Sequence, residues 1–161
     1  MEIDNVKLTN SKSIADAFNN YFSNIGSNIA ATIPTVDISF KKFLNKSICH
    51  SFFLSPITTL EVEDEITNLN VSKSVGPFSI PTKLLKILKF LLSGPLAYLF
   101  NCSFITGIVP DQFKLARVIP IYKNGSRSTV SNYRPISLLS VFNKILEKLM
   151  YKRIVTFLEK N

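Results

Sequence analysis

The sequence has 161 residues, of which 46% are hydrophobic and 19% charged, and its formal net charge is +8 at pH 7. This length allows one ordinary domain with an apolar core, and the composition excludes a disordered chain. The polar start does not read as a secretory signal, and the most apolar segment, residues 90–100, is too short to span a bilayer. Two cysteines and one histidine give no disulfide framework and no zinc spacing. We therefore expect an intracellular protein that is not secreted and does not enter a membrane.

The first half of the chain predicts two helices joined by a linker. Apolar residues at helical spacing predict a first helix over residues 11–33, with Ser11 or Ser13 as its N-cap. Residues 34–56 have no steady period and predict a linker with extended pieces. A second helix is expected from Thr58, where Thr58 and Glu61 match a capping box, to about Asn70.

The middle of the chain predicts two more helices. Ser79 followed by Pro81 indicates an N-cap and an early-turn proline, so a helix is expected over residues 80–92. Gly94 and Pro95 predict a break in that helix. A mostly buried helix should then run over residues 96–106 and end at Gly107.

The C-terminal third predicts strand, polar loop, strand and helix. The β-branched run at residues 115–123 predicts a strand, and Pro120 places it at an edge or a bulge. A loop opens at Asn124 and a second strand is expected over residues 133–138. Ser140 should cap a long final helix with an inner face of Val141, Ile145, Leu149, Ile154 and Leu158. The predicted fold class is α+β, mostly helical, with a short antiparallel β-hairpin near residues 115–138.

Positive charge is concentrated in the same third of the chain. Residues 111–161 contain ten bases and three acids, which gives +7 and leaves +1 for residues 1–110. Such an asymmetry indicates a polyanionic partner, although an ordinary solvated face is the competing interpretation.

Two of these bases stand at the root of the predicted loop. Lys123 ends the first strand and Arg134 begins the second, so antiparallel pairing would bring both near one end of the hairpin. A guanidinium can hold phosphate oxygens through two hydrogen bonds, while an ammonium supplies a mobile point charge. Pro135 restricts the backbone of Arg134. The pair therefore fits a triphosphate or a nucleic-acid backbone, or else two solvated bases at strand ends.

Four longer strings carry a resemblance to a known family. They read "GIVPDQFKLARVIPIYKNGS", "SNYRPISLLSVFNKILEKLMYKRI", "LEVEDEITNLNVSKSVGPFSIPTKLLK" and "PLAYLFNCSF". Together they closely resemble the N-terminal, or fingers, part of the reverse transcriptase domain of non-LTR, jockey-like retrotransposons. The resemblance covers roughly residues 52–161, so residues 1–51 are expected to be an N-terminal helix and linker preceding a partial reverse transcriptase domain. One departure is Gly76-Pro77-Phe78, where the family usually has Gly-Pro-Asp.

The resemblance implies roles for the basic residues. "VIPIYK" and "NYRPISLL" look like the two fingers motifs that fold over an incoming nucleotide, so Lys123 and Arg134 are expected to contact its triphosphate. Lys114, Arg117 and Arg127 are expected to contact template or primer phosphates. The implied partners are an RNA template and a DNA primer, the implied cofactors of the intact enzyme are Mg²⁺ and deoxynucleoside triphosphates, and the implied compartment is nuclear or cytoplasmic.

The family's metal-binding aspartates follow the fingers motifs, whereas the last aspartate here is Asp111, which precedes both. We therefore expect no catalytic residue, no metal ligand and no primer extension from these residues alone. Four acids open the second predicted helix (Glu61, Glu63, Asp64 and Glu65), and they fit the positive end of a helix better than a metal site. Similarly, Tyr133 either stacks on a base or packs beneath the hairpin.

Two other classes of function remain open. The chain could be a basic module that binds nucleic acid without catalysis, and Lys83, Lys86 and Lys89 form a further stripe that is either a wet face or a nucleic-acid contact. It could also be a non-functional retroelement remnant, which should aggregate because helices meant to be covered are exposed.

Overall fold

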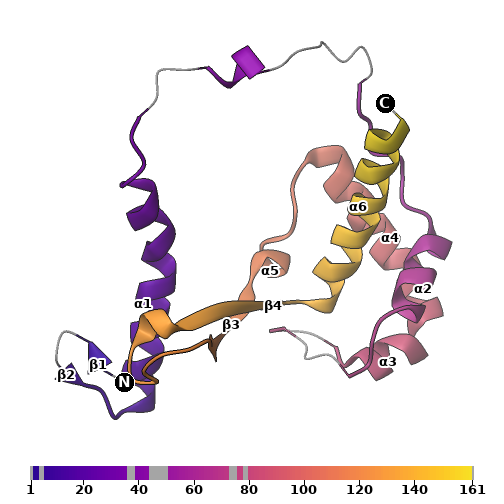
Figure 1. Ribbon diagram of the computed structural model, residues 1–161. Helices are drawn as coiled ribbons and strands as arrows, with labels where there is room; N and C mark the ends of the chain where they lie inside the picture. The colour runs from indigo at the N-terminus through magenta and orange to yellow at the C-terminus, as the bar shows by residue number, and fades with distance from the viewer. Residues whose placement is uncertain are drawn as a thin grey trace. The chain divides into compact units, whose positions relative to one another are not determined.

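The computed structural model describes residues 2, 3, 6–35, 39–43, 51–72, 76, 77 and 80–160. Contacts divide the chain into two compact units. The hairpin unit comprises Met1–Ser47 and Val118–Ile136, and the helical unit comprises Ile48–Arg117 and Ser137–Asn161. The elements are mostly helical, and the strands form two separate two-stranded sheets, so the predicted α+β fold class is confirmed (Figure 1).

The hairpin unit contains one long helix and most of the hairpin. Helix α1 (Ser11–Ala30) follows two short antiparallel strands, β1 (Glu2–Ile3) and β2 (Val6–Lys7), which the sequence did not predict. The N-cap of α1 is Asn10, because its side-chain oxygen accepts hydrogen bonds from the amides of Lys12 and Ser13 at 2.8 and 3.4 Å. The prediction of Ser11 or Ser13 as the cap was therefore wrong. A short 3₁₀ helix, η1 (Phe40–Phe43), lies in the predicted linker.

The hairpin consists of β3 (Ala116–Tyr122) and β4 (Tyr133–Leu139), joined by a loop that includes the 3₁₀ turn η2 (Val130–Asn132). The two strands form a sheet of their own, so each is an edge strand. A proline has no ladder donor and is tolerated only in such a position, which explains why Pro120 can sit within β3. Gly125 has φ +84°, a left-handed conformation that suits glycine, and it turns the loop.

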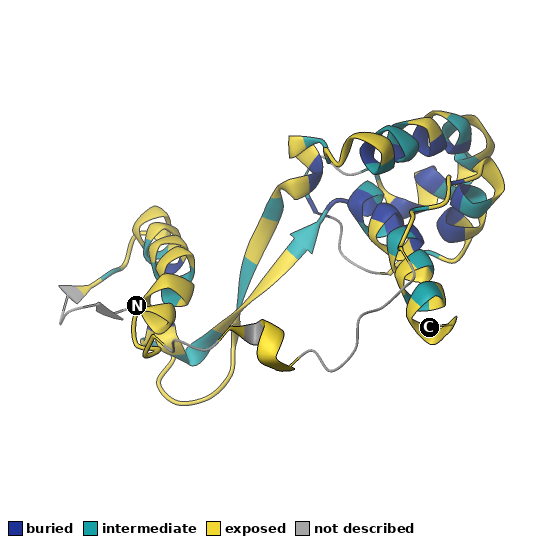
Figure 2. Cartoon of the chain, turned by 90° about the horizontal axis from the view of Figure 1, so that it is seen from above, coloured by how far each residue is buried: buried dark blue, intermediate teal, exposed yellow. Residues whose placement is uncertain are grey.

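The helical unit is formed by α2 (Thr59–Thr67), α3 (Thr82–Ile87), α4 (Lys89–Thr106), α5 (Asp111–Lys114) and α6 (Val141–Lys160). Its buried apolar residues form one cluster, seen as dark blue segments in Figure 2. The largest fully buried side chains of this cluster come from four helices: Val62, Ile66, Leu85, Phe100, Ile145 and Leu149. Helix α2 begins with the predicted capping box of Thr58 and Glu61.

Helix α4 runs through Pro95, so the predicted break at Gly94 and Pro95 was wrong. The chain turns instead at Leu88, whose φ of −89° and ψ of 9° separate α3 from α4. A proline inside a helix removes one hydrogen bond, and burial of Leu96, Ala97 and Phe100 directly after Pro95 offsets that loss. The predicted N-cap, Ser79, lies outside the described residues, as do one of the two cysteines, Cys49, and the single histidine, His50.

Gly76 has a structural role that the sequence motif alone did not reveal. A Cβ atom at this position would lie 2.4 Å from the carbonyl oxygen of Leu139 and 2.6 Å from that of Leu138. Only a residue without a side chain can approach the end of β4 so closely. The third residue of the motif, Phe78, lies outside the described residues.

Helix α6 starts as predicted, because the amide of Asn143 donates to the hydroxyl of Ser140 at 3.1 Å. Its predicted inner face is correct for Val141, Ile145 and Leu149, which are buried. It is wrong for Ile154 and Leu158, which are 38% and 65% exposed. The last turns of α6 therefore extend beyond the core of the helical unit. Among the described residues, no helix combines the length and the apolar character needed to cross a membrane.

Candidate nucleic-acid interface

The register of the hairpin near its loop follows from two contacts. The amide of Lys123 donates to the carbonyl oxygen of Asn132 at 2.9 Å. The rings of Tyr122 and Tyr133 meet edge to face with their centroids 5.6 Å apart. Both contacts fit a pairing in which Lys123 lies opposite Asn132 and Tyr122 lies opposite Tyr133.

This register indicates on which face of the hairpin the side chains of Lys123 and Arg134 lie. Lys123 directly follows β3, and side chains alternate between the faces of a strand, so this register predicts that Lys123 and Arg134 share one face, while Tyr122 and Tyr133 share the other. Lys123 and Arg134 are diagonal neighbours across the pair of strands, a relation that usually separates residues by about 7–8 Å. Both are exposed. Two long basic side chains at this separation can reach the same triphosphate or neighbouring phosphates of one strand.

No acidic residue occurs between Val118 and Ile136, although this segment contains three bases, namely Lys123, Arg127 and Arg134. Within the part of the chain that the structure describes, the side chains of Lys123 and Arg134 form no salt bridge. The face that carries them is therefore positive and free to accept an anion.

Arg127 differs from these two bases. Its guanidinium lies 5.2 Å from the centroid of the Tyr122 ring, which is the distance of a cation–π contact, and so it is associated with the tyrosine face. Lys114 and Arg117 belong to the helical unit. Lys114 pairs with Asp111 at 2.9 Å, and this exposed pair lowers the pKa of Asp111 through the hydrogen bond and the charge of Lys114. Of the five bases predicted to bind, the register of the hairpin thus predicts that two lie close together, Lys123 and Arg134.

Tyr133 packs beneath the hairpin. Its ring meets that of Phe18 in α1 edge to face at 4.9 Å, and its hydroxyl donates to the carbonyl oxygen of Arg127 at 2.8 Å. The alternative of stacking on a base does not fit a ring that is already packed between an aromatic helix residue and Tyr122.

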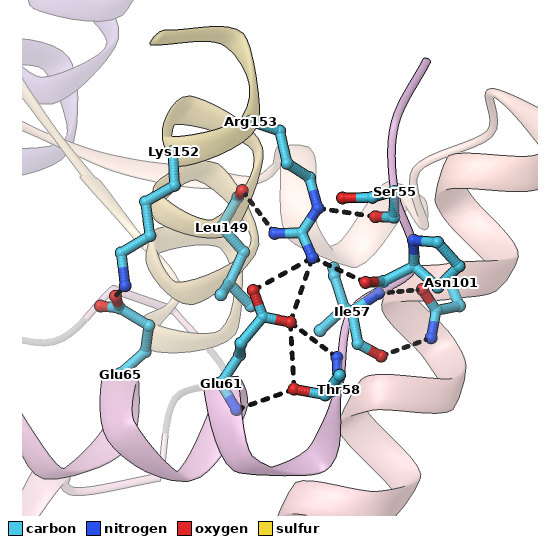
Figure 3. Close-up of polar contacts among 10 residues, drawn as sticks. Ser55, Ile57, Thr58, Glu61, Glu65, Asn101, Leu149, Lys152 and Arg153 are labelled. Atoms are coloured by element: carbon cyan, nitrogen blue, oxygen red, sulfur yellow. Dashed lines mark hydrogen bonds and ion pairs between the residues drawn. The ribbon is translucent and has the colours of Figure 1, made fainter. Parts of the chain in front are cut away.

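Two of the four acids at the start of α2, Glu61 and Glu65, are partners of bases on α6 (Figure 3). Nη2 of Arg153 lies 3.1 Å from both carboxylate oxygens of Glu61, and the same guanidinium donates to the carbonyl oxygens of Ser55, Pro56 and Leu149 at 2.6, 2.7 and 3.0 Å. The side chain of Arg153 is only 9% exposed. Sequence reasoning missed this contact, because nothing in the spacing pairs two residues that are 92 positions apart.

Glu65 is held in the same way by two lysines. Its carboxylate pairs with Lys152 at 2.5 Å and with Lys148 at 3.2 Å, and its side chain is 4% exposed. Burial raises the pKa of Glu65, but hydrogen bonds from Lys152 and Lys148 outweigh that effect and lower it. The pKa of Glu61 is lowered similarly, since burial is outweighed by the Thr58 amide and by Arg153.

These pairs change the interpretation of the basic C-terminal third. Lys148, Lys152 and Arg153 were counted as an excess over local acids, yet they contact acids from α2. The described residues contain no group of three or more histidines, cysteines, aspartates or glutamates that could hold a metal ion. The described part of the chain therefore offers no group of side chains that could bind the Mg²⁺ implied by the family resemblance.

Comparison with known proteins gives three informative relatives. The chain is 32% identical over 117 residues to an RNA-directed DNA polymerase from the mobile element jockey of Drosophila melanogaster, which covers 72% of this chain and 13% of the relative. It is 32% identical over 102 residues to a probable RNA-directed DNA polymerase from transposon BS of the same species, covering 63% and 11%. A third relative is the Pol polyprotein of the type-1 retrotransposable element R1 of Bradysia coprophila, 29% identical over 96 residues and covering 58% and 10%.

No family model matches the chain. The chain spans only about one eighth of the length of the jockey polymerase that it matches. These relatives belong to the same class of retrotransposon polymerase that the fingers motifs resemble. The homologues of this chain are RNA-directed DNA polymerases of jockey-like non-LTR retrotransposons.

Proposed function

We propose that this chain forms the fingers part of an RNA-directed DNA polymerase, in which Lys123 and Arg134 hold the triphosphate of the incoming nucleotide. One observation supports the proposal above all: both bases are exposed and flank the loop of a hairpin segment that has no acidic residue, where the amide of Lys123 donates to the carbonyl oxygen of Asn132. Homology to retrotransposon polymerases supplies the ligand class.

The chemistry of the two side chains fits a triphosphate. A guanidinium is planar and can donate two parallel hydrogen bonds to phosphate oxygens, while the ammonium of a lysine adds a mobile charge. Positive charge at this position favours the transition state of phosphoryl transfer, in which negative charge develops on the phosphate oxygens. Bond formation in such enzymes uses two metal ions, and we assign no metal-dependent step to the residues described here.

The proposal extends to the partners of the polymerase. An RNA template and a DNA primer would be the nucleic-acid ligands, and Lys114, Arg117 and Arg127 are the bases proposed to contact their phosphates. Such a polymerase would act inside the cell, in the nucleus or the cytoplasm.

Binding of a fluorescent deoxynucleoside triphosphate, followed by anisotropy, tests the proposed role. The variant K123A/R134A should bind at least tenfold more weakly, because two contacts to a charged group at about 1.5 kcal/mol each correspond to about a hundredfold in Kd. The control K12A/K42A removes the same charge from exposed positions of α1 and η1 and should bind like the unaltered chain. Equal losses in both variants, or no binding by the unaltered chain, would contradict the proposal.

A second candidate is a non-enzymatic module that binds nucleic acid without sequence preference. It is favoured by the three bases and no acids between Val118 and Ile136. Such a module would retain a labelled oligonucleotide in a salt-dependent manner and would bind a single nucleotide no better than inorganic triphosphate. Comparing the oligonucleotide, the deoxynucleotide and inorganic triphosphate in one assay separates the two candidates.

A further inference from the structure

Phe18 links α1 to the hairpin. It is the buried residue of α1, with 8% of its surface exposed. Its ring meets that of Tyr133 at 4.9 Å and that of Phe22, one helical turn away, at 5.7 Å. All of these residues belong to the hairpin unit. Helix α1 therefore packs on the hairpin segment through an aromatic contact made by its buried residue.

Tyr122 and Tyr133, which form the tyrosine face of the hairpin, also hold the loop through hydrogen bonds. The hydroxyl of Tyr122 donates to the carbonyl oxygen of Gly125 at 2.5 Å, and the hydroxyl of Tyr133 donates to that of Arg127 at 2.8 Å. The two rings also touch each other. The loop is thus tied at two points to the tyrosines, one of which is fixed by Phe18.

A two-stranded hairpin with one charged face needs such support. Two strands alone are at best marginally stable in water, and two like charges on neighbouring positions repel each other. Helix α1 packs against Tyr133, whereas Lys123 and Arg134 are exposed and are assigned by the register to the opposite face, so α1 contributes no ligand contact under the proposal. What it contributes is packing on the opposite face, directly behind Arg134, since Tyr133 precedes Arg134 in β4.

We infer that α1 braces the hairpin, and that Phe18 and Tyr133 are positioning residues that keep Lys123 and Arg134 in the arrangement that binds phosphate. This inference rests on the proposed function, and it assigns the N-terminal helix to the nucleotide site. When only a fraction of molecules holds the binding arrangement, the apparent affinity falls by that fraction. Loss of the brace therefore weakens binding although both basic side chains remain.

The variant Phe18→Ala tests this inference, because residue 18 touches no ligand under the proposal. Its Kd for the fluorescent deoxynucleoside triphosphate should rise by about tenfold, as expected when the competent fraction falls to about one tenth. The dependence of Kd on salt should remain that of the unaltered chain, since both cations still pair with phosphate. In K123A/R134A the salt dependence should weaken, because the cations themselves are gone.

Two further variants make the test specific. Phe18→Leu keeps much of the apolar volume and should restore most of the affinity, which also covers the case in which Phe18→Ala does not fold. Ile29→Ala changes a residue of the same helix that is 57% exposed and should bind like the unaltered chain. A wild-type Kd in Phe18→Ala, or a weakened salt dependence in that variant, would overturn the inference.

A second readout needs no ligand. Trypsin cleaves after lysine and arginine, and Lys123 and Arg127 lie at the loop. Cleavage at these two residues should be faster in Phe18→Ala than in Ile29→Ala, since the loop opens more often without the brace. If the unaltered chain binds no nucleotide, the proposed function fails, but the brace still stands if cleavage is accelerated. Equal cleavage rates in both variants would overturn the brace.

Discussion

Replacing Arg153 by methionine should destabilise the helical unit more than any change of a single surface charge. The guanidinium joins α6 to Glu61 and to three backbone carbonyl oxygens that precede α2 or lie in α6 (Figure 3). Methionine retains apolar volume but donates no hydrogen bond, so the variant leaves Glu61 and these oxygens without their donor.

The size of this destabilisation depends on how deeply the two partners of the ion pair are buried. Removing one partner of a fully buried ion pair costs about 3–5 kcal/mol. The side chain of Arg153 is 9% exposed, but that of Glu61 is 35% exposed, so water can solvate the carboxylate in the variant. We therefore expect the free energy of unfolding to fall by about 2–3 kcal/mol, below the range for a fully buried pair.

Urea denaturation followed by far-UV circular dichroism measures this change. Lys152→Met is the matched control in the neighbouring residue. The side chain of Lys152 is 55% exposed, and Glu65 keeps Lys148 at 3.2 Å, so this control should cost less than about 1 kcal/mol. The double variant E61Q/R153M should be less destabilised than the sum of its single changes. If Arg153→Met costs no more than Lys152→Met, the assignment of Arg153 as the link between α6 and α2 is wrong.

Three further predictions concern stability. Gly76→Ala should lower the free energy of unfolding by about 1–3 kcal/mol in the same urea assay, because its Cβ would lie 2.4 Å from the carbonyl oxygen of Leu139; an unchanged midpoint would refute this close approach. The pKa values of Glu61 and Glu65 are lowered in the folded state from an ordinary 4.5, so both carboxylates stabilise the fold above that pH and lose this effect as the pH falls below it. Thermal melts should thus show decreasing stability on acidification below pH 4.5, and E65Q should show a smaller decrease. Gly125→Ala should accelerate tryptic cleavage of the hairpin loop, since φ at this residue is +84° and a left-handed conformation costs other residues about 1–2 kcal/mol.

Local signals in the sequence predicted several elements correctly. The capping box at Thr58 and Glu61 starts α2, Ser140 starts α6, and Gly107 ends α4 with φ +70°. The hairpin followed from a β-branched run, a polar loop and a second run. Each of these signals acts within a few residues, so a short local stretch of sequence is enough to predict the element.

Signals that compete with tertiary packing were less informative. Gly94 and Pro95 usually interrupt a helix, yet α4 continues because the turns after Pro95 are buried. The break at Leu88 has no comparable signal in the sequence. Likewise, the period of α6 predicted a buried Leu158, but the core ends before that residue and leaves it 65% exposed.

The candidate site was predictable only in part. Alternation along the strands and the length of the loop predict that Lys123 and Arg134 lie near one another, and their role in binding stays a prediction. The contact of Phe18 with Tyr133 and the pairing of Arg153 with Glu61 join residues far apart in sequence, and no local pattern indicates them. The charge asymmetry along the chain was misleading for the same reason, since acids of α2 pair with bases of α6. The boundary between residues 51 and 52 stays a prediction.

Titration of the labelled chain with a deoxynucleoside triphosphate, followed by NMR, tests the central claim most directly. We expect saturable shifts of the amide and side-chain signals of Lys123 and Arg134, with smaller shifts at Phe18 and none at the lysines of α3. Shifts that appear only on α3 or α6, with Lys123 and Arg134 unaffected at saturation, would contradict the account.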